Sequence, residues 1–185
     1  MPKHFEKKVT ADGTITFYNE HAREHYHTLS GAMEEAELKH VAPAKRFFYD
    51  GCVVLDFCYG LGYNSFAALA YCEPRGYASR VIALENDIKI IRTLADVVLP
   101  ETYDRYRRDV LGMIDESPEV ISKDPSVLKY EKVFGMYTLT LFIGDAKETV
   151  KLLEDFGEQA DVVFFDPFSL RKTPEMWSAE VFSSI

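Results

Sequence analysis

The strongest constraint on the fold is a short apolar run followed by a helical segment, a pairing that recurs from residue 52 onward. Four such runs, at 52–57, 80–85, 137–143 and 161–166, are typical of strands buried on both faces. The segments that follow them carry apolar residues at helical spacing, most clearly over 87–98 and 145–156. This alternation predicts a right-handed, mostly parallel α/β sheet.

The N-terminal segment follows a different pattern. Residues 9–18 predict two short strands around an Asp12-Gly13 turn, and residues 31–41 predict a helix that Pro43 ends. We expect residues 1–50 to form a hairpin and helix extension that packs on a core domain of residues 51–185.

Two further expectations concern the core domain. Residues 100–136 are polar and interrupted by proline, which predicts an insertion with one helix over 101–114. A last helix begins near Pro174, so the fourth strand, 161–166, would lie at the edge of the sheet although it is apolar. Since such an edge is normally covered or paired, we expect a domain truncated after its fourth strand, or a partner chain or second copy that covers the edge.

Composition and charge narrow the class of protein. The 185 residues are 47% hydrophobic and 28% charged with a net charge of −9, which fits a globular domain and excludes a strong global basic field for nucleic acid. Three cysteines are too few for a disulfide scaffold, and the first ten residues contain no apolar stretch. We therefore expect a cytoplasmic protein with no secretory signal. The apolar stretch 51–72 contains Asp56, Asn64 and three glycines, which argues against a membrane span.

Acidic residues and glycines gather where the predicted strands end. Asp56 precedes a loop with Gly60 and Gly62, and Glu85 ends the second strand. Asp145-Ala146 follows the third strand and Asp166 ends the fourth. Because ligands of open parallel sheets bind beyond the carboxyl ends of the strands, these positions predict a shared nucleoside site, although each alone also suits a helix cap or a turn.

The loop chemistry favours one nucleoside ligand. Ser65 stands where a nicotinamide fingerprint would have its third glycine, and Asp56 before the loop would repel a pyrophosphate but suits an ammonium group. Four features follow one another along the chain: Asp56 with its glycine loop, Glu85 as a carboxylate for a ribose, Gly-Asp-Ala at 144–146 and Asp-Pro-Phe at 166–168. This series resembles the signature of class I S-adenosylmethionine-dependent methyltransferases.

More specific strings extend this resemblance. Tyr26-His27-Thr28, the loop from Leu55 to Asn64 and the string from Asp166 through Lys172 to Trp177 resemble the MnmC-like methyltransferase family. Leu170 and Thr173 depart from that family's pattern. The resemblance implies a Rossmann-like class I fold, S-adenosylmethionine as cofactor, and methyl transfer to the amine of 5-aminomethyluridine, often 2-thiolated, in tRNA.

The resemblance also implies roles for individual residues. Asp166 would orient the acceptor amine and take its proton. Phe168, Lys172 and His27 would meet the substrate. The remaining candidates would bind the cofactor: Asp56, Gly60, Gly62, Asn64, Glu85, Asp145, Ala146 and Tyr26.

Alternatives remain open at this point. An exocyclic base amine could be the acceptor, or the chain could be a noncatalytic or incomplete domain that needs a partner chain. The basic residues available for tRNA are Arg105, Arg107 and Arg108 on one predicted helix, and the pair Arg171-Lys172. His21, His25 and His27 lack the partners of a metal site, so we expect no metal.

Overall fold

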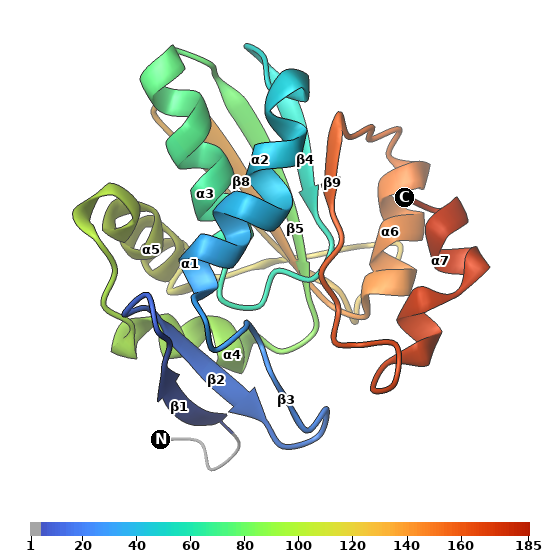
Figure 1. Cartoon of the computed structure of the whole chain (residues 1–185). Helices are drawn as coiled ribbons and strands as arrows, with labels where there is room; N and C mark the ends of the chain where they lie inside the picture. The colour runs from blue at the N-terminus through green and yellow to red at the C-terminus, as the bar shows by residue number, and fades with distance from the viewer. Residues whose placement is uncertain (1–4) are drawn as a thin grey trace.

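A computed structural model describes residues 5–185, and its centre is a six-stranded sheet in the order β6-β7-β8-β5-β4-β9 (Figure 1). The four strands β8, β5, β4 and β9 run parallel, while β6 and β7 are antiparallel to their neighbours. The strand bounds are β4 Cys52–Asp56, β5 Ser79–Glu85, β6 Glu119–Val120, β7 Leu128–Phe134, β8 Tyr137–Ile143 and β9 Val162–Phe164. The parallel strands therefore follow the chain in the order third, second, first, fourth, which confirms the predicted α/β class.

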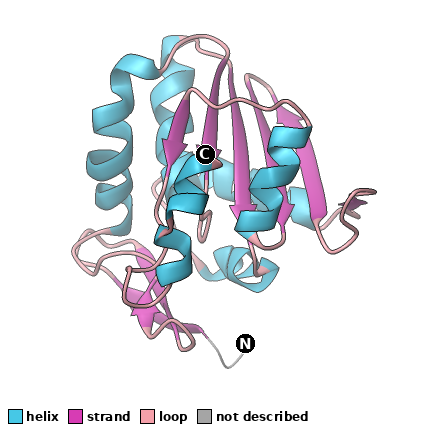
Figure 2. Cartoon of the chain, turned by 90° about the vertical axis from the view of Figure 1, so that its right-hand side faces the viewer, coloured by secondary structure: helices cyan, strands magenta, loops and turns pink. Residues whose placement is uncertain are grey.

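Helices cover both faces of this sheet, as Figure 2 shows. Helices α3 (Tyr63–Cys72) and α5 (Glu101–Ile114) lie on one face, and α6 (Ala146–Asp155) and α7 (Ala179–Ser183) lie on the other (Figure 1). The side chains of each strand alternate between the two resulting cores. Val81 and Ala83 of β5 join the core beneath α3, whereas Ile82 and Leu84 join the core beneath α6.

The N-terminal segment forms a separate three-stranded sheet beside the carboxyl ends of the parallel strands (Figure 1). Its strands are β1 Phe5–Val9, β2 Ile15–Asn19 and β3 Glu24–His25, and the predicted Asp12-Gly13 turn joins the first two. Residues 1–4, which belong to the expected extension and to the N-terminal stretch without a predicted secretory signal, lie outside the described residues.

The helix after this hairpin does not end at Pro43 as expected. Helix α1 (Ala32–Glu35) continues through a π-helical segment η1 (Ala36–Val41), α2 (Ala42–Ala44) and a 3₁₀ turn η2 (Lys45–Phe47). Pro43 lies in α2, directly after the π-helical segment, and this wider turn accommodates the proline within a continuous helix.

The stretch expected as an insertion contributes to the sheet itself. After α5, strand β7 pairs with the whole of β8 from Leu128↔Ile143 to Phe134↔Tyr137, and β6 extends that antiparallel edge. Two expected helices are shorter than predicted. Residues 87–98 form α4 (Ile88–Arg92) and a 3₁₀ turn η4 (Thr93–Asp96), and residues 173–185 form a turn η5 (Pro174–Trp177) before α7, where Ser178 caps a new start.

Strand β9 lies at the sheet edge, as predicted, and pairs with β4 alone among the strands of residues 5–185. The structure places the switch in strand order between β4 and β9, where parallel α/β sheets open a ligand crevice. Among the described residues, none of the helices has the length and hydropathy that a membrane crossing requires.

A cleft for cofactor and acceptor

A cleft of about 790 Å³ opens at the carboxyl ends of β4, β5, β8 and β9, beneath β3 and the segment that follows it. This volume lies within the range of small-molecule and cofactor sites. Two lysines and six carboxylates line the cleft: Lys39, Lys147, Glu24, Glu35, Glu85, Asp145, Asp166 and Glu175. The excess of negative charge favours a cationic ligand over a pyrophosphate.

The glycine loop after β4 shapes the floor of the cleft. Gly60 has a φ of 55° and its N–H donates to Glu85 Oε2 at 2.8 Å. A Cβ there would stand 3.2 Å from Tyr26 Cδ1, so the absence of a side chain lets the Tyr26 ring lie on the backbone. Gly62 has a φ of 76° and starts α3, but it faces Tyr59 behind the loop and does not line the cleft.

Glu85 is fixed by the backbone around it. One carboxylate oxygen accepts the Gly60 N–H, and the other accepts the N–H groups of Asn86 and Asp87 at 2.8 and 3.0 Å. Burial raises the pKa of Glu85, against the opposing effect of these three donors. Oε2, with one donor, retains a lone pair, and the carboxylate lines the cleft, which suits acceptance of a ribose hydroxyl.

Asp145 and Ala146 lie across the cleft from the glycine loop, at the start of α6. Asp145 Oδ1 caps this helix by accepting the N–H groups of Lys147 and Glu148 at 2.9 and 3.4 Å. Asp145 is also exposed at the cleft wall, so the cap and a ligand contact are compatible.

Asp56 is placed differently from the sequence-based expectation. Its side chain is fully buried and is absent from the cleft wall. Ser65 Oγ donates to its Oδ2 at 2.6 Å, while Oδ1 is buried with no hydrogen-bond partner. Burial raises the pKa of Asp56 to about 7. In this arrangement Asp56 supports the loop from behind, and a contact with the methionine end of a cofactor would require its side chain to turn outward.

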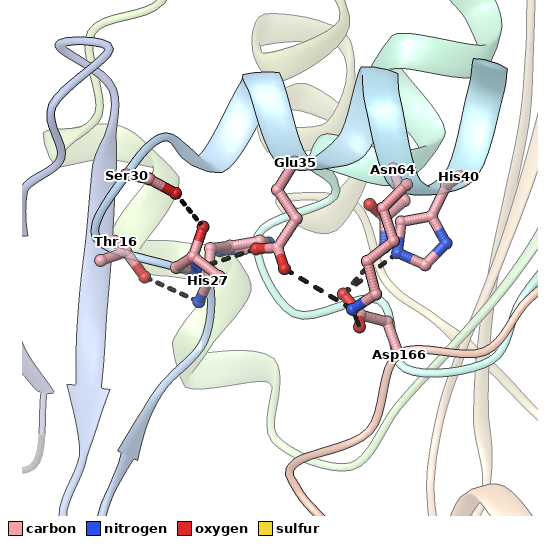
Figure 3. Close-up of polar contacts among 9 residues, drawn as sticks. Thr16, His27, Ser30, Glu35, His40, Asn64 and Asp166 are labelled. Carbon is pink, nitrogen blue, oxygen red and sulfur yellow. Dashed lines mark hydrogen bonds and ion pairs between the residues drawn. The ribbon is translucent and has the colours of Figure 1, made fainter.

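Asp166, just after β9, is contacted by side chains from two other elements (Figure 3). Lys39 Nζ lies 2.6 Å from its Oδ1, and Asn64 Nδ2 donates to Oδ2 at 3.5 Å. His40 Nε2 lies 3.4 Å from Oδ2, within ion-pair distance but without hydrogen-bond geometry. Burial would raise the pKa of Asp166, but the His40 and Lys39 contacts outweigh it and hold this pKa well below its ordinary value.

The loop after Asp166 is tied down on several sides. The Phe168 ring packs on Tyr26, with the ring centroids 5.1 Å apart. The Phe168 carbonyl accepts hydrogen bonds from Thr173 Oγ1 and Trp177 Nε1, both at 2.9 Å, so its lone pairs are already used. Phe168 therefore presents a ring, and not a free carbonyl, to the cleft.

The remaining predicted substrate residues are divided between the wall and the rim. His27 is buried in the wall with its ring edge on Tyr63, and burial lowers its pKa to about 4, so it is neutral near pH 7. Lys172 is exposed in the loop and does not line the cleft. Asn64, a predicted cofactor residue, is buried and does not line the cleft either, but its amide reaches Asp166 from α3. The structure thus brings Tyr26, His27, Gly60, Glu85, Asp145, Ala146, Asp166 and Phe168 together in the cleft wall.

Four site residues were missed from the sequence: Lys39, His40, Glu35 and Glu24. The first three lie within six residues on the helix over 32–41, where the i, i+4 spacing of Glu35 and Lys39 was a readable signal. Glu24 is the carboxylate that ties β3 to the loop, and nothing in its sequence context marked it.

Two other chemistries are not supported by the cleft. Within residues 5–185, His, Cys, Asp and Glu side chains form no group that could hold a metal ion. Cys58 lines the cleft, but burial raises the pKa of its thiol well above the ordinary value, which opposes a nucleophilic role.

The strand order, the glycine loop and the acidic cleft define a Rossmann-like domain of the class I methyltransferase type. Residues 117–185 match a family model described as S-adenosyl-L-methionine-dependent methyltransferase. The backbone resembles the crystal structure of MNMC2 from Aquifex aeolicus with a TM-score of 0.77 at 27% sequence identity, over 99% of this chain and 56% of that one.

Curated sequences show the same relationship. An uncharacterized protein of Methanocaldococcus jannaschii is 26% identical over 95% of this chain and 45% of its own length. The tRNA 5-methylaminomethyl-2-thiouridine biosynthesis bifunctional protein MnmC of Pseudomonas putida strain F1 is 27% identical over 90% of this chain and 24% of its own length. The chain thus spans less than half the length of these two relatives. The chain is therefore similar to MnmC-like methyltransferases, and the family model that its residues 117–185 match describes enzymes that depend on S-adenosylmethionine.

The residues present fit that cofactor. Glu85 offers a fixed carboxylate to a ribose, and the Gly60 backbone leaves the space that a Cβ would fill. The acidic wall suits a sulfonium and an ammonium. Within this cleft, Glu85, Asp145 and the glycine loop would hold the cofactor, and Asp166 faces the same space from the other side of the switch point.

Proposed function

We propose that this chain transfers a methyl group from S-adenosylmethionine to the amine of 5-aminomethyluridine, often 2-thiolated, in tRNA, in the cytoplasm. The proposal rests on one observation above all: Asp166, across the switch point from the glycine loop, already holds an alkylammonium group, that of Lys39. A relative that aligns with 90% of this chain carries a tRNA 5-methylaminomethyl-2-thiouridine biosynthesis name, which supports the choice of acceptor.

Asp166 is suited to bind and orient an amine. It is ionised, partly buried and fixed from behind by Asn64 and His40, so one oxygen remains to hold an N–H of the acceptor. Because its pKa is strongly lowered, Asp166 is a weak base. Asp166 therefore contributes to methyl transfer more by orienting the acceptor amine than by taking its proton, which can leave to water. When bound, S-adenosylmethionine supplies a methyl group that is already activated.

The tRNA part of the proposal depends on positive charge at the rim of the cleft. The cluster on α5 is neutralised internally, because Arg105 pairs with Glu73, and Arg107 and Arg108 both pair with Asp104. Arg171 and Lys172 are exposed in the loop that follows Asp166, and neither forms one of the ion pairs found among residues 5–185. These two residues are therefore the better candidates for contact with tRNA phosphates.

The experiment that tests this function is nucleoside mass analysis. The protein is incubated with S-adenosylmethionine and tRNA that carries 5-aminomethyl-2-thiouridine. We expect methylation of that nucleoside and a loss of about a hundredfold in turnover in Asp166→Asn, with cofactor affinity unchanged. Asp155→Asn, which removes an exposed carboxylate on α6, serves as the control.

Other outcomes distinguish the alternatives. Transfer to an adenine or cytosine amine would move the acceptor to exocyclic base amines. A folded chain that binds no S-adenosylmethionine would instead indicate a noncatalytic domain or one that needs a partner chain. Equal turnover in Asp166→Asn would remove Asp166 from the mechanism.

A further inference from the structure

Lys39 reaches into the cleft from the N-terminal helix and ends between two carboxylates. Its Nζ lies 2.6 Å from Asp166 Oδ1 and 3.5 Å from Glu35 Oε1. Lys39 and Asp166 are 127 residues apart in sequence, so their contact joins the N-terminal extension to the loop after β9. Neither carboxylate is a surface group, since the exposed fractions of their side chains are 13% and 14%.

The chemistry of this contact matches that of the acceptor. The aminomethyl group of the proposed substrate and the Lys39 side chain both end in a primary amine on a saturated carbon. Both are ammonium groups at neutral pH in the absence of a perturbing environment. Asp166 Oδ1 is the oxygen left to an acceptor, because Asn64 and His40 occupy the side of Oδ2.

We infer that Lys39 occupies the acceptor-amine position in the ligand-free protein, and that substrate binds by exchanging its own amine for that of Lys39. This inference rests on the proposed function and deepens it. Lys39 would then be a specificity-determining residue, because a substrate reaches Asp166 only if its primary amine can replace the Lys39 ammonium there.

The surroundings of Lys39 permit the exchange. Its side chain is 54% exposed, so it can move without opening the core. Glu35 is four residues earlier on the same helix and is anchored by the Thr28 N–H, which donates to Glu35 Oε2 at 2.8 Å. After displacement, Lys39 can therefore stay paired with Glu35 while the acceptor takes Asp166.

Asp166 keeps its position during the exchange. Asn64 contacts Oδ2 from α3, and His40 contacts it from η1, the element that also carries Lys39. The burial of His40 and Asn64 holds these contacts in place, since 7% and 3% of the two residues are exposed. These two contacts leave the Asp166 carboxylate preorganised for the incoming amine.

A titration with ethylammonium, a small primary ammonium, tests the exchange without turnover or tRNA. The full chain, with ¹⁵N-labelled lysine and with S-adenosylhomocysteine bound, is followed by NMR at the lysine Nζ. The Lys39 resonance is assigned by its absence from Lys39→Met, and Asp166→Asn supplies the reference position of a released Lys39. Lys151, whose Nζ pairs with Glu148 on the exposed face of α6, is the internal control.

We expect the Lys39 resonance to move toward its position in Asp166→Asn as ethylammonium saturates, while the Lys151 resonance stays in place. If Lys39 holds Asp166 in nine of ten molecules, Lys39→Met will bind ethylammonium about tenfold more tightly than the wild type. Lys151→Met will bind it as the wild type does.

Two results would overturn the inference, and they differ in what else they affect. Saturable binding of ethylammonium with no movement of the Lys39 resonance would refute the exchange and leave the amine acceptor intact. No binding of ethylammonium to either the wild type or Lys39→Met, in protein that binds S-adenosylhomocysteine, would refute the exchange and the proposed amine acceptor together.

Discussion

Glu24 and Ser169 form a two-point connection between the N-terminal sheet and the loop that carries Asp166. Ser169 Oγ and Ser169 N–H donate to the two oxygens of the Glu24 carboxylate at 2.5 and 2.9 Å. The residues are 145 positions apart in the chain. This connection bridges β3 to the loop after β9, so the mouth of the cleft depends on it.

The first prediction concerns this bridge. Glu24→Gln keeps the shape of the side chain but weakens two charge-assisted hydrogen bonds, which are worth about 1.5–3 kcal/mol each when charged. We expect faster amide hydrogen exchange over residues 166–173 with little change in the exchange of β5. Glu6→Gln removes an exposed carboxylate from β1 of the same sheet and is the control. Equal exchange in the two variants would show that the bridge does not hold the loop.

A second prediction concerns the ring over the glycine loop. Tyr26→Ala removes the ring that packs on Phe168 and Gly60, and we expect S-adenosylmethionine affinity to fall at least about tenfold. Tyr26→Phe keeps the ring and loses only the hydrogen bond from Asn19 Nδ2 to the hydroxyl. Its affinity should stay within about threefold of the wild type, as calorimetry would measure. Equal losses in both variants would assign the effect to the hydroxyl.

The third prediction concerns Gly62, where two effects oppose any side chain. Its φ of 76° disfavours an L-residue, and a Cβ would stand 2.4 Å from Tyr59 Oη. We expect Gly62→Ala to lower the free energy of unfolding by about 2 kcal/mol or more in urea denaturation. Gly112→Ala in α5, where a Cβ meets nothing within 4 Å, should raise it by about 0.5–1 kcal/mol. Similar effects of the two substitutions would contradict this account of the loop.

The fourth prediction concerns pH. Burial raises the pKa of Asp56 from 3.8 to about 7, so the folded state binds its proton more tightly than the unfolded state does. The contribution of this proton to the free energy of unfolding is fully present below pH 4 and is lost as the pH rises to 7. His27 acts in the opposite direction, because burial lowers its pKa from 6.5 to about 4, and stability is gained as the pH rises through that interval.

Asp56→Asn removes the first contribution and leaves the second. We therefore expect the unfolding free energy of this variant to rise with pH between 4 and 6.5 relative to the wild type. The difference in slope should be on the order of 1 kcal/mol per pH unit. Asp115→Asn, at an exposed carboxylate after α5, should follow the wild-type curve. Parallel curves for Asp56→Asn and the wild type would show that Asp56 is not protonated in the folded state near neutral pH.

The sheet was predictable at β4, β5 and β8, whose runs are mostly buried on both faces. Strand β9 is also an apolar run, although Val163 is exposed at the sheet edge. Strand β7 was not predictable, because Lys129 and Glu131 interrupt its apolar positions and its identity depends on pairing with β8. The end of the N-terminal helix was misplaced at Pro43 because a π turn, which has no sequence signature, accommodates the proline.

The candidate site was predictable as a place and less so as a set of contacts. Strand topology places Glu85, Asp145 and Asp166 around one cleft, which follows from parallel strands alone. The burial of Asp56 behind the loop depends on the direction of one side chain. The Lys39 contact with Asp166 spans 127 residues. Neither the burial of Asp56 nor this contact could be derived from sequence spacing.

The most direct test of the central claim is a calorimetric titration of S-adenosylmethionine into this chain and its Glu85→Gln variant. We expect one site per chain in the wild type and affinity at least about tenfold weaker in the variant, because the variant loses the anionic acceptor for the ribose. Asp161→Asn alters a carboxylate that accepts the Val53 N–H at the amino ends of β4 and β9, away from the cleft, and should bind as the wild type does. Unchanged affinity in Glu85→Gln, or no binding to the folded wild type, would contradict the assignment of this cleft.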